Sequence, residues 1–270
     1  MKNKYNLAAR AAVLALTLTA AFAFTTAAFA QSPYATSRPG TERVSSDGVL
    51  PNSLWYGGDL NHVNGLANER DSSLGIGQFA HVFGDFVVPT GQMWNVTGLY
   101  SNNYDSMTGV NSVEWSIRQG ITDGNGGTLI ASGTAGPGNF QVIFHNAGDF
   151  GYTEYSVVAQ NLNILLTSGT YFLNVTPIGN GFGRSFDPDT SGAGCIGTPC
   201  GNNGNAFFDS NFFGANYQPT SMQGQPGDFS MGVICGGEFC VPEPPPWAIM
   251  ATGAVVLIGV QQLRRRRKKA

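Results

Sequence analysis

The chain has 270 residues, of which 42% are hydrophobic and only 11% are charged, and it contains 37 glycines. A typical soluble domain carries about 25% charged residues and about 7% glycine, so this chain is poor in charge and rich in glycine. That composition excludes a coiled coil or a helix bundle, which need many Lys, Glu, Ala and Leu residues, and the apolar content excludes wholesale disorder.

The charges are segregated along the chain. Residues 31–240 contain five arginines, no lysine and sixteen Asp and Glu residues, which leaves this segment with a charge of −11. Phosphate binding depends on clustered Lys and Arg, so nucleic acid is not an expected partner. Cations or neutral polymers fit the charge better.

Residues 1–30 have the pattern of a secretory signal peptide. A cationic stretch, residues 1–10, precedes an apolar, alanine-rich segment, residues 11–29, which closes on Ala28, Phe29 and Ala30. Small residues of this kind precede a signal-peptidase cut, and cleavage is expected after Ala30. A retained membrane anchor is the alternative, and the absence of a flanking charge after the apolar segment disfavours it.

Residues 31–50 are rich in Ser, Thr, Pro and Gly and predict a flexible lead-in to a domain at 51–240. Near the start of this domain, Trp55 and Tyr56 are followed by two glycines. These two aromatic residues could offer a contact surface for a sugar ring, although core packing is the commoner role of such residues.

The domain itself predicts an all-β fold. Residues 113–119 alternate apolar and polar side chains, residues 123–127 are rich in Asp, Asn and Gly, and residues 128–132 begin a return strand, which together predict a hairpin. Further strands are predicted at 79–88, 93–100, 140–145, 152–159, 162–166, 170–176, 206–209 and 228–235. About nine short strands with frequent turns indicate a single jelly-roll-like β-sandwich.

No catalytic motif is apparent between residues 31 and 240. The sequence lacks a Gly-x-Ser-x-Gly elbow and a phosphate-binding loop, and His62, His81 and His145 lack the spacing of metal ligands. A carboxylate pair for glycoside hydrolysis stays open, because the two partners would meet only in the fold. No catalytic residue is therefore assigned, and the chain is not expected to be an enzyme.

Asp187 and Asp189 open a segment that resembles a calcium loop. The sequence from Asp187 to Gly192 has oxygen ligands at alternate positions, but Thr198 stands where the loop would need a carboxylate. A turn is the competing interpretation. Calcium is the one cofactor for which the sequence offers a candidate.

Four cysteines are spaced as Cys195-x4-Cys200 and Cys235-x4-Cys240. Export would place them in an oxidising compartment, where disulfides are the default expectation. Three pairings exist, and the two local ones are favoured. A four-cysteine zinc site is the rival, although zinc sites prefer tighter two-residue spacing.

The C-terminal segment, residues 241–270, combines three features. Pro242, Glu243 and Pro244 are followed by an apolar run that predicts a transmembrane helix over about residues 247–263. Six cations close the chain, namely Arg264, Arg265, Arg266, Arg267, Lys268 and Lys269. Such a cluster holds its end of a helix on the cytoplasmic side, so residues 31–240 would lie outside. A plain membrane anchor would also fit.

This order of motif, span and basic cluster resembles the sorting tail of PEP-CTERM proteins of Gram-negative bacteria. The resemblance covers residues 241–270 and implies processing by an exosortase, an integral-membrane protease-like enzyme, followed by attachment or release at the cell surface. Pro245 and Pro246 stand where the family usually has Ser or Thr. Bacteria with this system commonly make extracellular polysaccharide.

Three functions follow as expectations. The first is a structural or adhesive protein of the cell envelope or extracellular matrix, associated with surface polysaccharide. The second is a lectin-like carbohydrate-binding module, and the third is a glycan-active enzyme. The expected route runs from an inner-membrane intermediate to the periplasm, outer surface or matrix.

Overall fold

In this computed structural model, the described residues form thirteen strands and one short 3-10 helix, and several of the strands alternate apolar and polar side chains. The structure describes residues 31–34, 48–146, 148–224 and 227–236. The chain divides into two compact units, Met1–Ser32 and Pro33–Ala270, and the strands belong to the second. The predicted signal peptide at 1–30 and the sorting tail at 241–270 lie outside the described residues.

The expected all-β fold is confirmed. The elements are β1 (Ser53–Tyr56), β2 (Leu60–Ala67), β3 (Glu69–Arg70), β4 (Phe79–Asp105), β5 (Ser112–Gln119), β6 (Thr128–Ala135), β7 (Phe140–Asn146), β8 (Thr153–Ala159), β9 (Ile164–Ile178), β10 (Ser185–Thr190), β11 (Phe207–Ser210), β12 (Ala215–Pro219), the 3-10 helix η1 (Thr220–Gln223) and β13 (Met231–Cys235). Within the described ranges, no helix is both long and apolar enough to cross a membrane.

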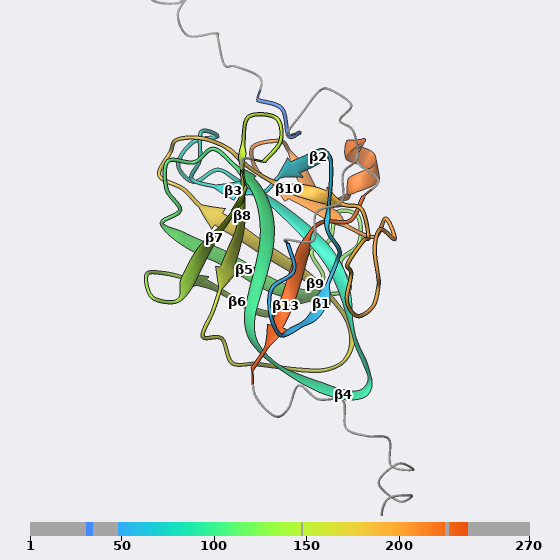
Figure 1. The fold of residues 1–270 in the computed structure, drawn as a ribbon. Coiled ribbons are helices and arrows are strands. Elements are labelled where there is room, and N and C mark those ends of the chain that lie inside the picture. Colours follow the sequence, from blue (N-terminus) through green and yellow to red (C-terminus); the bar gives the residue numbers. More distant parts are fainter. Residues whose placement is uncertain (1–30, 35–47, 147, 225–226, 237–270) are drawn as a thin grey trace, which may run out of the picture. The chain divides into compact units, whose positions relative to one another are not determined.

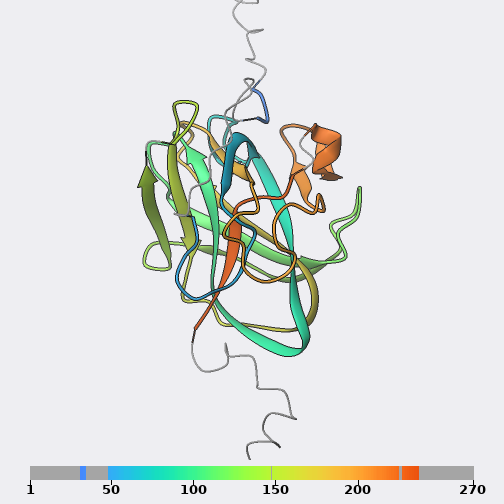
Figure 2. The same cartoon turned by 45° about the vertical axis from the view of Figure 1, so that its right-hand side comes forward.

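The long strand β4 connects two arms of the sheet (Figure 1). Its first part pairs with β9 and β11, and β9 continues to β5 and β6, so the first arm has the order β6-β5-β9-β4-β11-β12. Its last part pairs with β8 and β13, which continue to β7 and β1. Figure 1 and Figure 2 show β4 bending at one end of the domain, so that its first and last parts both run back through the domain.

The two arms pack against each other through one large apolar core. The ring of Trp55 on β1 lies 5.6 Å from that of Phe86 on β4. Gly84 on β4 faces Met231 on β13 so closely that a Cβ atom at Gly84 would lie 2.9 Å from the Met231 sulfur. The strands therefore bury their apolar faces in a sandwich-like arrangement.

Asparagine side chains also lie inside the domain. The Nδ2 of Asn68 donates to Oδ1 of Asn103 at 3.1 Å and to the carbonyl of Val175 at 2.8 Å, and both asparagines are fully buried. Asn174 Nδ2 donates to the carbonyl of Val82 at 3.0 Å. These amides connect neighbouring strands, since buried polar groups require partners.

The expected local disulfide joins Cys195 to Cys200. Its loop lies along the edge of β1, because Ile196 and Tyr56 exchange two backbone hydrogen bonds of 3.0 Å. Cys235 is also disulfide-bonded, and Cys240 lies outside the described residues. The covalent ring thus covers a strand edge that would otherwise present unpaired backbone groups.

Candidate functional site

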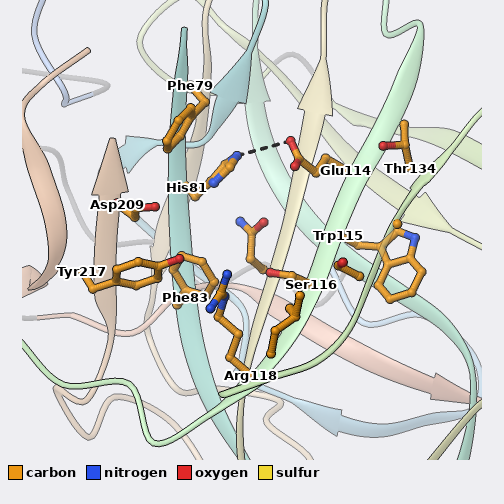
Figure 3. Close-up of a pocket in the computed structure, with 14 residues that line it drawn as sticks. Phe79, His81, Phe83, Glu114, Trp115, Ser116, Arg118, Thr134, Asp209 and Tyr217 are labelled. Atoms are coloured by element: carbon orange, nitrogen blue, oxygen red, sulfur yellow. Dashed lines mark ion pairs between the residues drawn. The ribbon is translucent and has the colours of Figure 1, made fainter. Parts of the chain in front are cut away.

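A cleft of about 300 Å³ lies on the face of the first arm that points away from the main core. Its fourteen lining residues are Phe79, His81, Phe83, Glu114, Trp115, Ser116, Arg118, Leu129, Ser132, Gly133, Thr134, Asn174, Asp209 and Tyr217. Figure 3 shows that the labelled side chains come from several strands and gather around one space. The cleft therefore depends on strands that are distant in sequence.

The alternation of each strand explains how the cleft is built. On β4, Phe79, His81 and Phe83 line the cleft, whereas Ala80 and Val82 belong to the main core. The same alternation on β5 brings Glu114, Ser116 and Arg118 to the cleft side, and Trp115, which belongs to the main core, also borders the cleft. Successive side chains of a strand point to opposite faces, so one strand serves both the core and the site.

A row of ionisable side chains crosses the cleft. Nε2 of His81 lies 3.5 Å from Oε2 of Glu114, and Asp209 stands opposite His81 in the pairing of β11 with β4 (Figure 3). Nη1 of Arg70, on β3, lies 2.6 Å from the same Glu114 oxygen. His81 therefore lies in a row between two carboxylates.

The two carboxylates have pKa values displaced in opposite directions. Burial alone would raise the pKa of Glu114, but hydrogen bonding and charge from His81 and Arg70 outweigh it and lower this pKa to about 2. Burial raises the pKa of Asp209, against the opposing effects of the His81 charge and the Tyr217 backbone N–H. Glu114 is thus ionised at neutral pH, and Asp209 takes up a proton more readily than a free aspartate.

Aromatic rings stand at the edges of this row. Phe79 stacks on the imidazole of His81, with centroids 4.5 Å apart and planes 22° from parallel. The guanidinium of Arg118 lies 5.2 Å from the centroid of the Tyr217 ring, and its Nη1 donates to the carbonyl of Gly126 at 2.9 Å. Phe83 and Tyr217 join a small second core beneath the cleft.

The remaining polar groups offer directional hydrogen bonds. The hydroxyl-bearing residues Ser116, Ser132 and Thr134 line the cleft, and so does Asn174, which is nearly fully buried and donates through Nδ2 to the carbonyl of Val82. Rings beside fixed donors and acceptors suit a ligand with apolar ring faces and several hydroxyl groups.

The structure corrects the expectation for Trp55 and Tyr56. Trp55 is 3% exposed and Tyr56 is fully buried, and the Trp55 indole N–H donates to the carbonyl of Pro199 at 3.1 Å. Neither side chain can contact a ligand at the surface. The competing interpretation, packing in the interior, is the correct one.

The calcium-loop interpretation of Asp187 and Asp189 is also wrong in its geometry. Both residues belong to β10, a buried strand that pairs with β2 and β4, and neither lies in a loop. Among the described residues, no group of three or more His, Cys, Asp or Glu side chains is placed to hold a metal ion. Burial and the charge of Asp189 raise the pKa of Asp187 well above its usual range.

The other sequence candidates fall elsewhere. Pro242, Glu243, Pro244 and the basic residues 264–269 lie outside the described ranges. Sequence reasoning did not identify the cleft, although it predicted the strands that carry Phe79, His81 and Glu114. The available signal was the run of polar or aromatic residues on the outward side of these strands.

Comparisons of the chain with protein-family models, with curated proteins and with solved structures found no match.

Proposed function

We propose that the chain is an exported protein of the cell envelope or extracellular matrix, and that its β domain holds surface polysaccharide in the cleft on the first arm. The observation that carries this proposal is the row of hydrogen-bonding side chains between the rings of Phe79 and Tyr217. Aromatic faces bind the apolar face of a sugar ring, and the polar groups between them accept and donate hydrogen bonds to its hydroxyls. The role is structural or adhesive, exerted by binding alone.

The proposed architecture is a jelly-roll-like β-sandwich. Two arms that share β4 and enclose one core support it. In this arrangement the outer face of an arm is free of core packing and can carry a binding site.

The proposed route to the surface depends on the two ends of the sequence. The signal-peptide pattern at 1–30 supports export, and the Pro242-Glu243-Pro244 motif with its apolar span and basic cluster supports sorting by an exosortase. The membrane is then a partner only before processing. The Cys195–Cys200 disulfide fits an oxidising compartment.

Binding of a panel of polysaccharides to the full chain, purified in a mild detergent, tests the proposed function. Phe79→Ala and Tyr217→Ala should each weaken glycan binding by about tenfold or more, because each removes an aromatic face worth roughly 1 kcal/mol beyond its buried area. Phe182→Ala is the matched control, since Phe182 is 66% exposed and does not line the cleft. Isothermal titration calorimetry gives the affinities.

The proposal fails if no polysaccharide of the panel binds. It also fails if the cleft variants, shown by circular dichroism to be folded, bind as well as Phe182→Ala.

A glycan-cleaving enzyme is the second candidate, favoured by the opposite pKa displacements of Glu114 and Asp209. His81 lies in the row between these carboxylates. A scissile bond would have to lie over His81, on the open side of the cleft. Release of reducing ends from a bound polysaccharide, abolished by Glu114→Gln, would favour the enzyme over the adhesive protein.

A further inference from the structure

We infer that the cleft takes an uncharged glycan and rejects uronic-acid polymers. The inference rests on the proposed function and adds the charge class of the ligand. It follows from the way in which the charged groups of the cleft are already paired.

The basic groups of the cleft have partners within the protein. Arg118 and His81 are the two basic residues among the fourteen that line it. Arg118 donates through Nη1 to the carbonyl of Gly126 and lies over the Tyr217 ring, while His81 has Glu114 within 3.5 Å and Asp209 opposite it. Among the described residues, Nε of Arg118 and Nε2 of His81 have no hydrogen-bond partner, but both atoms are buried. A ligand carboxylate would have to compete with the Tyr217 ring for Arg118 and with two carboxylates for His81.

Arg70 is engaged in the same way. Its Nη1 lies 2.6 Å from Oε2 of Glu114, and Arg70 is not among the lining residues. Its charge is therefore used to hold Glu114 ionised.

The acidic groups of the cleft would repel an anionic sugar. The Glu114 side chain remains 25% exposed and Asp209 is only partly buried, so both carboxylates are within reach of a bound ligand. Like charges that are partly removed from water interact more strongly than in bulk solvent. A uronate placed between Phe79 and Tyr217 would meet this repulsion along the whole row.

The surrounding segment adds a long-range effect of the same sign. Residues 31–240 contain sixteen acidic residues and five arginines, so the domain repels a polyanion before contact. This effect is screened by salt over about 8 Å at physiological ionic strength, whereas the repulsion within the cleft is screened much less.

The uncharged groups match a neutral sugar. Hydroxyls of Ser116, Ser132 and Thr134 can exchange hydrogen bonds with sugar hydroxyls, and Glu114 can accept them. A hydroxyl donor gains a charge-assisted hydrogen bond from a carboxylate, which a second carboxylate cannot provide.

Affinity electrophoresis of the full chain in mild detergent tests the inference. The gels contain either neutral polymers, galactomannan and β-glucan, or polyuronates, alginate and polygalacturonate, at 20 and 150 mM salt. Wild-type protein should be retarded by at least one neutral polymer and by neither polyuronate at either salt concentration.

Two matched variants separate the local repulsion from the long-range charge. Asp209→Asn keeps an oxygen that can accept the Tyr217 N–H and removes one charge inside the cleft, whereas Asp123→Asn removes one charge at an exposed turn outside it. Asp209→Asn should raise the affinity for polyuronate relative to neutral polymer by about tenfold. Asp123→Asn should change this ratio less than twofold.

The outcomes are distinguishable. Polyuronate binding to wild-type protein with the affinity of neutral polymer would overturn the inference and leave the proposed function standing. Equal effects of Asp209→Asn and Asp123→Asn would overturn the local explanation. Binding of no polymer at all would refute the proposed function and the inference with it.

Discussion

At the scale of single residues, the domain contains carboxylic acids that are buried and have no cationic neighbour among the residues that the structure describes. Burial raises the pKa of Asp105 to about 7, of Asp189 to about 7 and of Asp228 to about 6. Each of these side chains is at most 5% exposed. Glu69 differs, because Nε of Arg184 lies 2.7 Å from its Oε1 and opposes the effect of burial.

These acids predict that the domain is more stable at mildly acidic pH than at pH 8. Their pKa values in the folded state lie above the value of about 3.9 for an unfolded aspartate. At any pH between the unfolded and the folded pKa, the folded state therefore binds more protons than the unfolded state. The free energy of unfolding therefore falls as pH rises from about 4 to 7 and is level above that. Thermal unfolding should show a Tm about 5–10 °C higher at pH 5 than at pH 8.

Asp189→Asn provides the control for this pH dependence. The amide removes one titrating group without changing the size of the side chain, so the difference between pH 5 and pH 8 should shrink. A wild-type Tm that is equal at both pH values would contradict the explanation. Below about pH 4 the trend reverses, because Glu114, whose pKa is lowered to about 2, loses its contacts with His81 and Arg70 on protonation.

The asparagines show where residue-level reasoning fell short. In the sequence, Asn and Gly together favour irregular turns. Asn68, Asn103 and Asn174 instead lie buried in or beside strands. Asn68 and Asn174 donate to neighbouring strands, whereas Asn103 donates to Ser101 of its own strand and accepts from Asn68. Turn propensity describes a residue in isolation. Whether an asparagine side chain is buried next to a backbone carbonyl that needs a donor depends on the assembled sheet.

At the scale of elements, the sequence predicted most central strands but divided the longest ones. The segments 79–88 and 93–100 belong to one strand, β4, with a register irregularity between Val88 and Met93. Residues 167–169, which separate the predicted strands 162–166 and 170–176, are part of β9, and Gly169 pairs with Val88. Long-range pairing keeps these residues extended even though their local sequence favours a turn.

The five strands that sequence reasoning missed have a physical explanation of their own. β1, β2, β3, β10 and β12 are short, or carry residues that are rare in strands. β10 has the sequence Ser-Phe-Asp-Pro-Asp-Thr, yet all six residues are buried. Asp and Pro favour turns in isolation, and the pairing of Asp187 and Pro188 with β2, beside the pairing of Ser185 and Phe186 with β4, places them in a sheet.

The cleft could not be predicted for the same reason. The alternation in β4 and β5 indicates which residues face outward. It does not indicate which strands lie next to each other in the sheet. His81, Glu114 and Asp209 meet only because β9 and β4 lie between β5 and β11.

The close packing of β13 on β4 gives a prediction at this scale. A Cβ atom at Gly232 would lie 2.4–2.5 Å from atoms of the Tyr100 side chain, which is fully buried. Gly232→Ala should therefore lower the free energy of unfolding by about 2 kcal/mol, the usual cost of overpacking. Urea denaturation measures the change.

Gly109→Ala is the matched control for this substitution. No heavy atom lies within 4 Å of a Cβ built at Gly109, and its φ is outside the left-handed region. Its stability should stay within about 0.5 kcal/mol of the wild type. Equal stabilities of the two variants would show that the packing against Tyr100 leaves room for a Cβ atom at residue 232.

At the scale of the whole molecule, the predicted route to the cell surface leads to a measurable mass. If residues 1–30 are removed on export and the tail is cut near Pro242, Glu243 and Pro244, the recovered chain begins at Gln31 and ends near that motif. All four cysteines should be oxidised, as the Cys195–Cys200 bond and the bonded state of Cys235 suggest. Intact-mass spectrometry before and after thiol alkylation measures both.

A full-length chain with free thiols, recovered from the cytosol, would contradict this route. Deletion of residues 241–270 should leave the β domain folded and release it without attachment, which surface proteolysis of intact cells can detect.

The alternation of β4 also has an evolutionary consequence. Residues with odd numbers from 79 to 83 line the cleft, and the even-numbered residues between them belong to the main core. Substitutions on one side need not disturb the other. If the cleft binds a glycan as proposed, related chains could exchange one specificity for another while the scaffold and its folding stay the same.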